Sequence, residues 1–458
     1  LSFDKGAAYT QTDANGFFVV PDGAKYMRAS YVSENGATLK SVTFSELEHP
    51  ENFDFERKDP ASDMPLNWQS YVLETTDDTY TRRYQAGVGV DNSAALQVTT
   101  QKDNEKGALV IYSSRVAVKP NAVYRVTFQG KYSGESIGVF PLARTFKTNG
   151  ADTSDGTPYN WLTAANSANG DGAWHSYSAD FTTGSDAVTM EMRFEVHSYK
   201  AGAEFLFDNV SVRYLGDADD ANLGFETGEN GEAPFNWTFY ERREKPNAPG
   251  EYEEGSFGAY TVKKVDGAAA DGVGAAAVVQ KPETGMVQLY LQSAMIPVEG
   301  NTSYLLSYDA MVRGNKKGSV IVCVRQFTDK LGNGTDDESV NFTWVPEANA
   351  YGSFDWRNCG ATFKTAPGTK YIRIWLVPNT AEACEMYFDN VAVTPTEEIA
   401  DPNLDFEYVA GGKPLNWTYA TSDGIADITA DSSVYYNGGH SLHIRKQYNR
   451  INYTTAEM

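Results

Sequence analysis

Hydrophobic and polar residues alternate in short segments over most of the chain. The alternation is clear at residues 124–128, 192–197 and 304–308, where apolar or aromatic side chains occupy every second position. A period of two places successive side chains on opposite faces of a β-strand, so each segment predicts a strand with one buried face. Turns rich in glycine, proline and asparagine separate these segments, and few stretches have a helical period. The pattern predicts an all-β protein.

A longer phrase occurs three times along the chain. It opens with Asn-x-x-Phe-Glu and closes with Pro-x-Asn-Trp, and the closing residues are Trp68, Trp237 and Trp417. Intervals of roughly 170 to 180 residues are too long for a solenoid repeat and are typical of whole domains. The three tryptophans have the same proline and asparagine neighbours. We therefore expect them to pack in equivalent cores.

The repeats divide the chain into four parts. Residues 49–216 and 217–396 are two complete modules, each closing on a strand that reads Phe-Asp-Asn-Val. Residues 1–48 contain a segment similar to the last strands of the second module, so we interpret them as the end of a preceding module. Residues 397–458 contain the third opening phrase, so we interpret them as the start of a further one. Many short strands in about 165 residues predict tandem two-sheet antiparallel β-sandwiches, with the jelly roll as the expected topology.

Charge and composition narrow the range of partners. A net charge of −23 over 458 residues repels nucleic acid, and no apolar run approaches the ~20 residues that cross a bilayer. The sequence shows neither an initiator methionine nor a signal peptide, so we expect a mature or trimmed product. Because Cys323, Cys359 and Cys384 are odd in number, they cannot all pair with one another. Whether Cys359 and Cys384 form a disulfide stays open.

The order of these motifs resembles a known family. The opening phrase, a middle strand entered through a turn with proline or glycine, and the closing Phe-Asp-Asn-Val strand are similar to carbohydrate-binding modules of the family 4, 9 and 22 type. The resemblance covers residues 50–450. It implies non-catalytic jelly-roll modules, found in secreted bacterial polysaccharide-degrading enzymes and cell-surface proteins. It also implies a structural calcium ion in each module.

Two pairs of acidic residues are the candidate metal ligands. Glu56 and Asp208 lie in the first and last segments of one module, and Glu226 and Asp389 in those of the next. A sandwich can place its first and last strands side by side, where two carboxylates repel each other unless a proton or cation joins them. Carboxylate and carbonyl oxygens suit Ca²⁺. The alternative is that each carboxylate only accepts hydrogen bonds from backbone amides.

The candidate ligand-binding residues share an aromatic, charged or imidazole side chain and a place on strands or in a polar loop. They are Arg144, Phe146, Trp161, Arg193, Glu195, His197, Arg325, Phe327, Trp344, Arg373 and Trp375. Sugars pack their C–H edges on aromatic faces, while charged and amide groups take the hydroxyls. The alternative is ion pairs and packing under the loop. For Trp174 and Trp356 we favour core packing.

The two modules differ at aligned positions of one strand. We align Arg193 with Arg373 and Glu195 with Trp375, so the modules are not expected to share one specificity. Alternation places Trp375 on the face opposite Ile374. We expect it to be outward-facing, so that its loss leaves stability nearly unchanged.

The sequence therefore predicts an extracellular array of non-catalytic modules that anchors a larger secreted or cell-surface protein to a polysaccharide. Catalytic or surface domains of the same parent chain are expected as neighbours. The rival interpretation is a spacer or adhesin stalk of β-sandwiches without a glycan site. No nucleotide-binding loop, nucleophile elbow or metal-ligand spacing of histidine with cysteine supports catalysis.

Overall fold

The structure is a computed structural model, and it describes most of the chain beyond residue 50. The described residues are 2–3, 8–9, 27–28, 51–104, 106–154, 158–168, 170–314, 319–330, 341–396, 403–410, 412–415, 417–421, 426–446 and 451–455. The chain divides into two compact units, Leu1–Pro50 and Glu51–Met458. In the first unit β1 (Ser2–Phe3) pairs with β2 (Ala8–Tyr9) and β3 (Met27–Arg28). The rest of the predicted closing piece at 1–48 lies outside the described residues.

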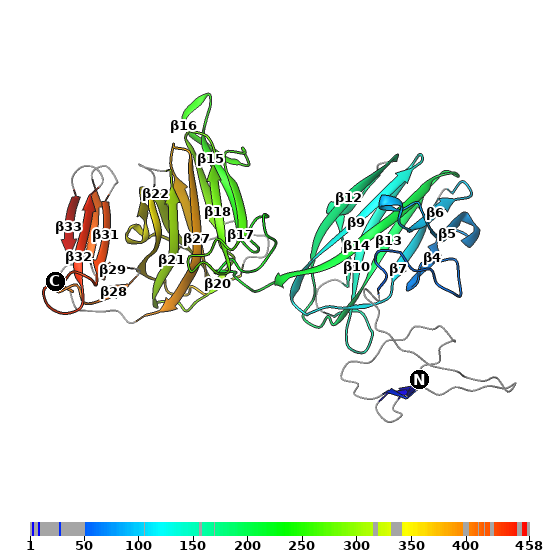
Figure 1. Cartoon of the computed structure of the whole chain (residues 1–458), viewed down its shortest axis with the longest axis horizontal. Helices are drawn as coiled ribbons and strands as arrows, with labels where there is room; N and C mark the ends of the chain where they lie inside the picture. Colours follow the sequence, from blue (N-terminus) through cyan, green and yellow to red (C-terminus); the bar gives the residue numbers. More distant parts are fainter. Residues whose placement is uncertain are drawn as a thin grey trace. The chain divides into compact units, whose positions relative to one another are not determined.

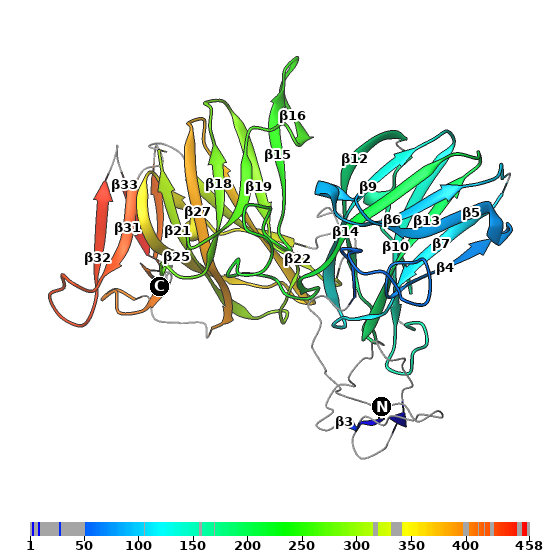
Figure 2. The same cartoon turned by 45° about the vertical axis from the view of Figure 1, so that its right-hand side comes forward.

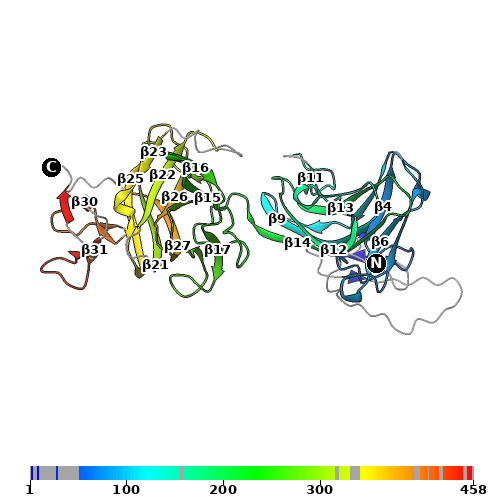
Figure 3. The same cartoon turned by 90° about the horizontal axis from the view of Figure 1, so that it is seen from above.

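The second unit contains two complete β-sandwiches, whose layers are seen in Figures 1 and 3. The first sandwich packs a six-stranded antiparallel sheet, in the order β11-β10-β13-β7-β4 with β8 beside β13, on a five-stranded sheet, β12-β9-β14-β6-β5. Its strands are β4 (Trp68–Leu73), β5 (Tyr80–Gln85), β6 (Ala95–Thr100), β7 (Ala108–Ser113), β8 (Val116–Ala117), β9 (Ala122–Ser133), β10 (Ile137–Phe146), β11 (Tyr159–Trp161), β12 (Asp171–Thr182), β13 (Thr189–Ser198) and β14 (Glu204–Asp217).

The second sandwich repeats this order and adds two strands, β16 and β24, to the larger sheet. Its eight-stranded sheet runs β16-β15-β19-β26-β22-β23, with β20 beside β26 and β24 beside β22, and its five-stranded sheet runs β17-β18-β27-β21-β25 (Figure 2). The strands are β15 (Thr238–Lys245), β16 (Ala248–Gly255), β17 (Thr261–Asp266), β18 (Ala275–Lys281), β19 (Val287–Gln292), β20 (Ile296–Pro297), β21 (Ser303–Arg313), β22 (Ser319–Phe327), β23 (Asn341–Trp344), β24 (Ala350–Tyr351), β25 (Phe354–Lys364), β26 (Tyr371–Asn379) and β27 (Cys384–Pro395). The predicted tandem of all-β, two-sheet sandwiches is confirmed.

Each core forms between the two sheets from residues at alternate strand positions. Trp68 is buried in the first core and Trp237 in the second, as expected, and the Trp68 ring stacks on Phe194 at 6.0 Å between centroids. Burial of such aromatic surface is the main stabilising contribution to a sandwich of this size. The cysteines Cys323, Cys359 and Cys384 are buried and none of them forms a disulfide, which answers the question left open for Cys359 and Cys384. Burial raises the pKa of the Cys384 thiol to about 11.

The repeated opening phrase forms a hydrogen-bonded loop under each tryptophan. Asn52 is fully buried with φ of 54°, and its side-chain amide donates to the carbonyls of Arg57 and Leu66, both at 2.9 Å. The Asn52 side-chain oxygen accepts from the Arg57 amide at 3.0 Å. The Trp68 indole N–H donates to the Asn52 carbonyl at 3.1 Å. The phrase is therefore a structural clamp that holds the chain entering β4.

The same clamp recurs in the other two copies of the phrase. Trp237 donates to the Asn222 carbonyl at 3.0 Å, and Trp417 donates to the Asn403 carbonyl at 2.7 Å. Beyond the second sandwich the chain forms β28 (Val409–Ala410), β29 (Lys413–Pro414), β30 (Trp417–Thr421), β31 (Ala426–Asp431), β32 (Ser441–Lys446) and β33 (Ile451–Thr455). They pair as β28-β29, β30-β33 and β31-β32. Among the described residues, no helix is long and apolar enough to cross a membrane.

The register of β13 and β26 corrects one alignment made from the sequence. The Met192 amide donates to the Ser113 hydroxyl at 3.0 Å, and the Ile374 amide donates to the Ser293 hydroxyl at 3.0 Å. Met192 and Ile374 are therefore equivalent. It follows that Arg193 corresponds to Trp375 and Glu191 to Arg373, so the alignment of Arg193 with Arg373 is wrong by two residues. A shift of two positions leaves each side chain on the same face of the strand, so the alternation of apolar and polar residues did not reveal it.

Candidate functional site

The outer face of the six-stranded sheet in the first sandwich carries a band of aromatic and charged side chains. Strand pairing places one row across the whole sheet, at positions that alternate with core residues. This row consists of Trp161, Leu142, Arg193, Tyr112 and Gln69. A second row beside it joins Tyr159, Arg144 and Glu191. The face is a continuous surface built from five strands.

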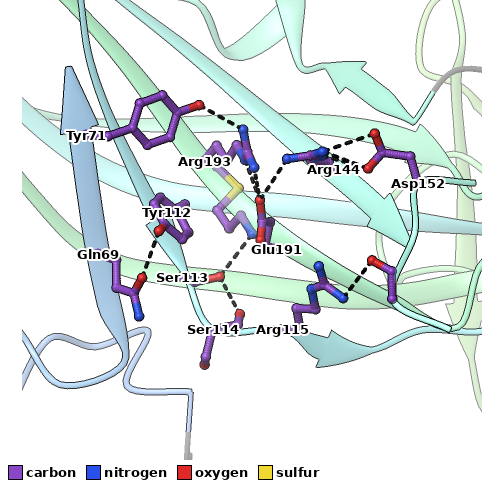
Figure 4. A network of polar contacts seen from close by, with 12 residues as sticks. Gln69, Tyr71, Tyr112, Ser113, Ser114, Arg115, Arg144, Asp152, Glu191 and Arg193 are labelled. Carbon is purple, nitrogen blue, oxygen red and sulfur yellow. Dashed lines mark hydrogen bonds and ion pairs between the residues drawn. The ribbon is translucent and has the colours of Figure 1, made fainter. Parts of the chain in front are cut away.

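A pocket of about 610 Å³ opens on this face. Strands β4, β7, β10 and β13 supply its floor, and the loop after β10 supplies one wall. The lining residues are Tyr71, Tyr112, Arg115, Arg144, Phe146, Gly150, Ala151, Asp152, Glu191 and Arg193. Figure 4 shows the charged and phenolic groups of this set, which come from β4, β7, β10 and β13 and, for Arg115 and Asp152, from the segments that follow β7 and β10. Most of the groups that face the pocket are hydrogen-bonding groups.

A network of ion pairs fixes the arginines in the pocket. Arg193 Nε donates to Glu191 Oε1 at 2.5 Å, and both side chains are largely buried. Arg193 Nη1 also donates to the Tyr71 hydroxyl at 3.1 Å. Arg144 makes a fork to Asp152, with Nε to Oδ1 at 2.9 Å and Nη2 to Oδ2 at 3.0 Å. Such two-point pairs fix the guanidinium planes, so the pocket keeps its shape before a ligand arrives.

The electrostatics of the network follow from these contacts. The hydrogen bond from Arg144 lowers the pKa of the Asp152 carboxyl, and the positive charges of Arg193 and Arg115 add to this effect. The same hydrogen bond raises the pKa of Arg144. Glu191 Oε1 also lies 4.0 Å from Arg144 Nη1, so Glu191 sits between two guanidinium groups. The Asp152 carboxylate is thereby held in its ionised form at neutral pH.

Exposed aromatic rings lie beside the polar groups. Trp161 on β11 is 48% exposed and Tyr71 on β4 is 38% exposed. The centroids of the Tyr71 and Tyr112 rings lie 5.9 Å apart. The Arg144 guanidinium carbon lies over the Tyr159 ring, 4.9 Å from its centroid. Aromatic faces of this kind pack against the C–H edges of sugar rings. The arrangement combines apolar platforms with fixed hydrogen-bonding groups.

The predicted residues of the first sandwich fall into two groups. Arg144, Phe146 and Arg193 line the pocket, and Phe146 is only 2% exposed, so it contributes beneath the arginines rather than as an open platform. Glu195 and His197 lie on the same face without lining the pocket, and His197 Nε2 is 2.7 Å from Glu195 Oε1. The His197 ring also contacts Phe140 edge to face at 5.1 Å between centroids.

In the second sandwich the equivalent face is filled by its own side chains. Trp375 points away from the main core, as alternation predicted, but it is only 7% exposed, so the expectation of an open position is wrong. It belongs to a separate hydrophobic cluster formed with Tyr290, Cys323 and Val377. The Tyr290 ring meets Trp375 edge to face at 5.4 Å. Neighbouring side chains on β19 and β22 therefore cover the indole.

The remaining candidates of the second sandwich are distributed around this cluster. The Arg325 guanidinium lies over the Trp375 ring at 4.8 Å, and Arg325 pairs in register with Arg373. Phe327 is 1% exposed, so its proposed role as an open contact is wrong. Trp344 on the edge strand β23 is 48% exposed and contacts Phe342 at 6.4 Å. The exposed aromatic surface of this face lies at its edge.

The expectation of core packing for Trp174 and Trp356 is also wrong. Both are half-buried, and neither belongs to a core cluster. Trp174 pairs in register with Lys131, next to the core residue Tyr132, so it lies on the outer face of the five-stranded sheet. Trp356 contacts Tyr387 at 6.0 Å on the corresponding sheet of the second sandwich. These two tryptophans lie on the sheets that do not carry the pocket.

Several pocket residues were missed by sequence reasoning. The alternation that buries Trp68 also turns Tyr71 outward, and the alternation that buries Ile111 turns Tyr112 outward, so both could have been found. Glu191 was hidden by the two-residue alignment error. Arg115 and Asp152 lie outside regular alternation, between β7 and β8 and in the loop after β10, and no sequence pattern placed them on this face.

The structure brings each predicted carboxylate pair to one short segment. Asp208 Oδ2 accepts from the Val90 amide at 2.8 Å and the Ser93 hydroxyl at 2.9 Å. Glu56 Oε1 accepts from the Ala94 amide at 2.9 Å. Burial raises the pKa of Asp208, and the negative charge of Glu56 adds to the rise. Hydrogen bonding to backbone amides, the alternative considered for these residues, is thus present.

The second pair has the same arrangement. Asp389 Oδ2 accepts from the Ala270 amide at 2.9 Å, and Glu226 Oε1 accepts from the Ala275 amide at 3.0 Å. A Cβ atom on Gly274, which has φ of 83°, would lie 2.1 Å from Glu226 Oε1, so this glycine permits the carboxylate to approach the backbone. Burial raises the pKa of Asp389, with smaller contributions from Glu226 and Asp309.

The donor set of both pairs fits a hard cation in charge and chemistry. Each pair brings negative charge together at a buried aspartate, and no basic side chain contributes to the pKa of either aspartate. Oxygen donors of this kind suit Ca²⁺. Within the described ranges, no group of three or more His, Cys, Asp and Glu side chains could hold a metal ion. Backbone carbonyls or water would therefore complete any coordination shell.

Comparison with known proteins agrees with the architecture. Residues 51–201 match the family model described as a carbohydrate binding domain. The first sandwich is therefore similar to carbohydrate-binding modules, and the predicted resemblance is confirmed. Comparison with curated proteins gave no match.

Three of the similar solved structures are carbohydrate-binding modules. The CBM22-1–CBM22-2 tandem domain of Xyn10C from Paenibacillus barcinonensis is 11% identical, with 75% of this chain and 96% of that chain covered and a TM-score of 0.34. The CBM22-1 xylan-binding domain of that enzyme is 14% identical, with 35% and 91% covered and a TM-score of 0.25. A family 11 module of Lic26A-Cel5E from Clostridium thermocellum is 15% identical, with 32% and 88% covered and a TM-score of 0.23.

Proposed function

We propose that the first sandwich binds a polysaccharide or oligosaccharide, without catalysis, on the outer face of the sheet β11-β10-β13-β7-β4. The observation that carries this proposal is the pocket in which fixed arginine–carboxylate pairs lie beside the exposed ring of Tyr71, on a sheet face that also carries the exposed Trp161. A glycan needs both kinds of surface, because its ring faces are apolar and its edges carry hydroxyl groups. The match of residues 51–201 to a carbohydrate binding domain supports the same proposal.

The carboxylates of the pocket favour binding over hydrolysis. A glycosidase needs one carboxyl group that stays protonated near neutral pH and a second one that is ionised. Here Glu191 is bound to Arg193, and Asp152 is bound to Arg144, which lowers the pKa of Asp152. Asp152 is therefore not suited to donate a proton, and Glu191 is occupied by the Arg193 guanidinium. We therefore assign the pocket to recognition.

We further propose that this binding anchors a larger secreted or cell-surface protein to its glycan. The net charge of −23 keeps such a chain soluble outside the cell, and non-catalytic modules act through the domains to which they are joined.

The second sandwich favours a different role. Trp375, Cys323 and Val377 close the face that corresponds to the pocket, and aromatic exposure is concentrated at Phe342 and Trp344. A face filled by its own side chains has no room for a sugar ring. This observation favours the spacer function for the second sandwich, beside a binding function for the first.

For Ca²⁺ we propose a structural site in each sandwich, with Glu56 and Asp208 as ligands in the first and Glu226 and Asp389 in the second. Support comes from the burial of each aspartate and from its repulsion by the glutamate of the same pair. The ion would replace repulsion by attraction and would join the first and last segments of the sandwich.

A glycan array probed with the full chain tests the proposed binding function. We expect retention of the chain on a subset of polysaccharides, with the signal lost when Trp161 is replaced by alanine. No retention on any polysaccharide of the array would contradict the proposal and would leave the spacer function for both sandwiches.

A further inference from the structure

Arg115 differs from the other two arginines of the pocket. Arg144 is bound to Asp152 and Arg193 to Glu191, whereas Arg115 forms no ion pair with a carboxylate among the residues described. Its side chain is exposed, and one of its nitrogen atoms, Nη1, donates to the Gly150 carbonyl at 3.2 Å. Most of the guanidinium N–H donors therefore remain available to a ligand.

Two contacts hold the Arg115 guanidinium in place. It lies over the Phe146 ring, with 3.4 Å between the guanidinium carbon and the ring centroid. On the other side, Gly150 has φ of 79°, and a Cβ atom there would lie 3.2 Å from Arg115 Nη1. A guanidinium stacked on an aromatic ring keeps its plane and its charge, and its edge is free for two-point contact with an anion.

The charges of the pocket lining do not cancel. Arg115, Arg144 and Arg193 supply three positive charges, while Asp152 and Glu191 supply two negative ones. This local positive excess lies on a chain whose net charge is −23. A neutral sugar can accept hydrogen bonds from Arg115, but it cannot balance the charge of the guanidinium. An anionic group on the ligand would form an ion pair with Arg115, as Asp152 does with Arg144 and Glu191 does with Arg193.

We infer that the pocket recognises a glycan with an anionic group, a uronic acid carboxylate or a sulfate ester, and that Arg115 binds this group. The inference rests on the proposed glycan-binding function and adds the ligand class to it. Tyr71, which lines the same pocket, would contact a sugar ring while Arg115 takes the charge.

The test compares charged glycans with their neutral counterparts, using the full chain. The probes are polygalacturonate, alginate and glucuronoxylan, each before and after carboxyl reduction, and carrageenan before and after desulfation. Affinity is measured by electrophoresis in gels that contain the polymer, at about 20 mM and 200 mM NaCl, because screening at higher salt weakens contacts between exposed charges. The carboxyl-reduced and desulfated arms distinguish the two sources of charge.

We expect at least one charged polymer to bind roughly tenfold more tightly than its neutral counterpart, with the difference shrinking at 200 mM NaCl. Arg115→Gln should remove most of this preference. Arg213→Gln is the matched control, because it removes the same charge from an exposed position on β14 in the opposite sheet.

Two outcomes would overturn the inference. Equal affinity for the charged and neutral forms of every polymer, with Arg115→Gln behaving like the unmodified chain, would show that Arg115 only packs on Phe146. If the chain then binds neutral polymers and Trp161→Ala does not, the proposed glycan-binding function remains supported, although the inference about Arg115 is wrong. Failure to bind any polymer, charged or neutral, would remove both.

Discussion

The indole N–H of Trp68 donates to the backbone carbonyl of Asn52 at 3.1 Å, inside the first core. The corresponding bond joins Trp237 to Asn222 and Trp417 to Asn403. The motif that repeats most exactly in the sequence is therefore a structural clamp, and it lies away from the candidate pocket. Repetition of an identical environment marks a packing requirement, whereas the pocket residues differ between the two sandwiches.

The clamp predicts a large effect at its asparagine. Asn52→Ala should lower the free energy of unfolding of the first sandwich by about 2–4 kcal/mol, because it removes three side-chain hydrogen bonds and leaves buried carbonyls without donors. Asn92→Ala is the control, since Asn92 also has positive φ, of 64°, but an exposed side chain. Denaturant unfolding of the full chain measures both. Equal losses in the two variants would mean that backbone strain, and not the clamp, accounts for the effect.

Trp375 and Trp344 provide a second contrast, within the second sandwich. Trp375→Ala should destabilise it by about 3–5 kcal/mol, because the indole is covered by Tyr290 and Cys323 and its removal leaves a cavity. Trp344→Ala, at an exposed position, should change stability by less than about 0.5 kcal/mol. Thermal and denaturant unfolding distinguish the two. A Trp375→Ala variant as stable as the parent would contradict the buried placement.

The proposed calcium sites predict a change in thermal stability. Because a cation that binds only the folded state stabilises it, Ca²⁺ should raise the Tm of the chain and chelation with EDTA should lower it. Glu226→Gln should abolish the part of the rise that belongs to the second sandwich and leave the first unaffected. If the melting curves with Ca²⁺ and with EDTA coincide, the carboxylates only cap backbone amides.

The raised pKa of Asp208 gives the calcium effect a pH dependence. Without metal, the folded state holds a proton on Asp208 more tightly than the unfolded state, whose value is near 3.8. This contribution to stability is fully present below that value and is lost as the pH rises through the folded pKa. Ca²⁺ binds the deprotonated form, so the rise in Tm on adding Ca²⁺ should grow over the same pH interval. An identical calcium effect on both sides of that interval would exclude Asp208 as a ligand; Asp208→Asn is the control.

The fold could be predicted from the sequence because its two signals are local and repeated. Alternation identifies the strand faces, and three copies of one phrase reveal a module. Alternation also predicted correctly that Trp375 points away from the main core. Alternation could not predict that the Trp375 indole is buried. Tyr290, which covers it, lies 85 positions away in the chain on β19, and the order of strands in the sheet brings the two residues together.

The site was predicted less completely for a related physical reason. Arg193 was found from alternation on a single strand, and Arg144 and Phe146 were found from their correspondence with Arg325 and Phe327. The partners Asp152 and Tyr71, however, come from a loop and from another strand. Pairing register, fixed here by the Ser113–Met192 and Ser293–Ile374 hydrogen bonds, decides which residues meet across a sheet. A shift of two residues preserves the facing of every side chain, so periodicity cannot detect it.

The most direct test of the account compares two accessible tryptophans on opposite sheets of the first sandwich. Trp161 lies on the face with the pocket, and Trp174 lies on the outer face of the five-stranded sheet. Binding of the full chain to a glycan retained on the array is measured by isothermal titration for Trp161→Ala and Trp174→Ala. We expect Trp161→Ala to lower the affinity for the glycan at least roughly threefold, and Trp174→Ala to bind with the same affinity as the parent chain. Loss of binding in Trp174→Ala with full binding in Trp161→Ala would place the glycan on the other sheet and contradict the account.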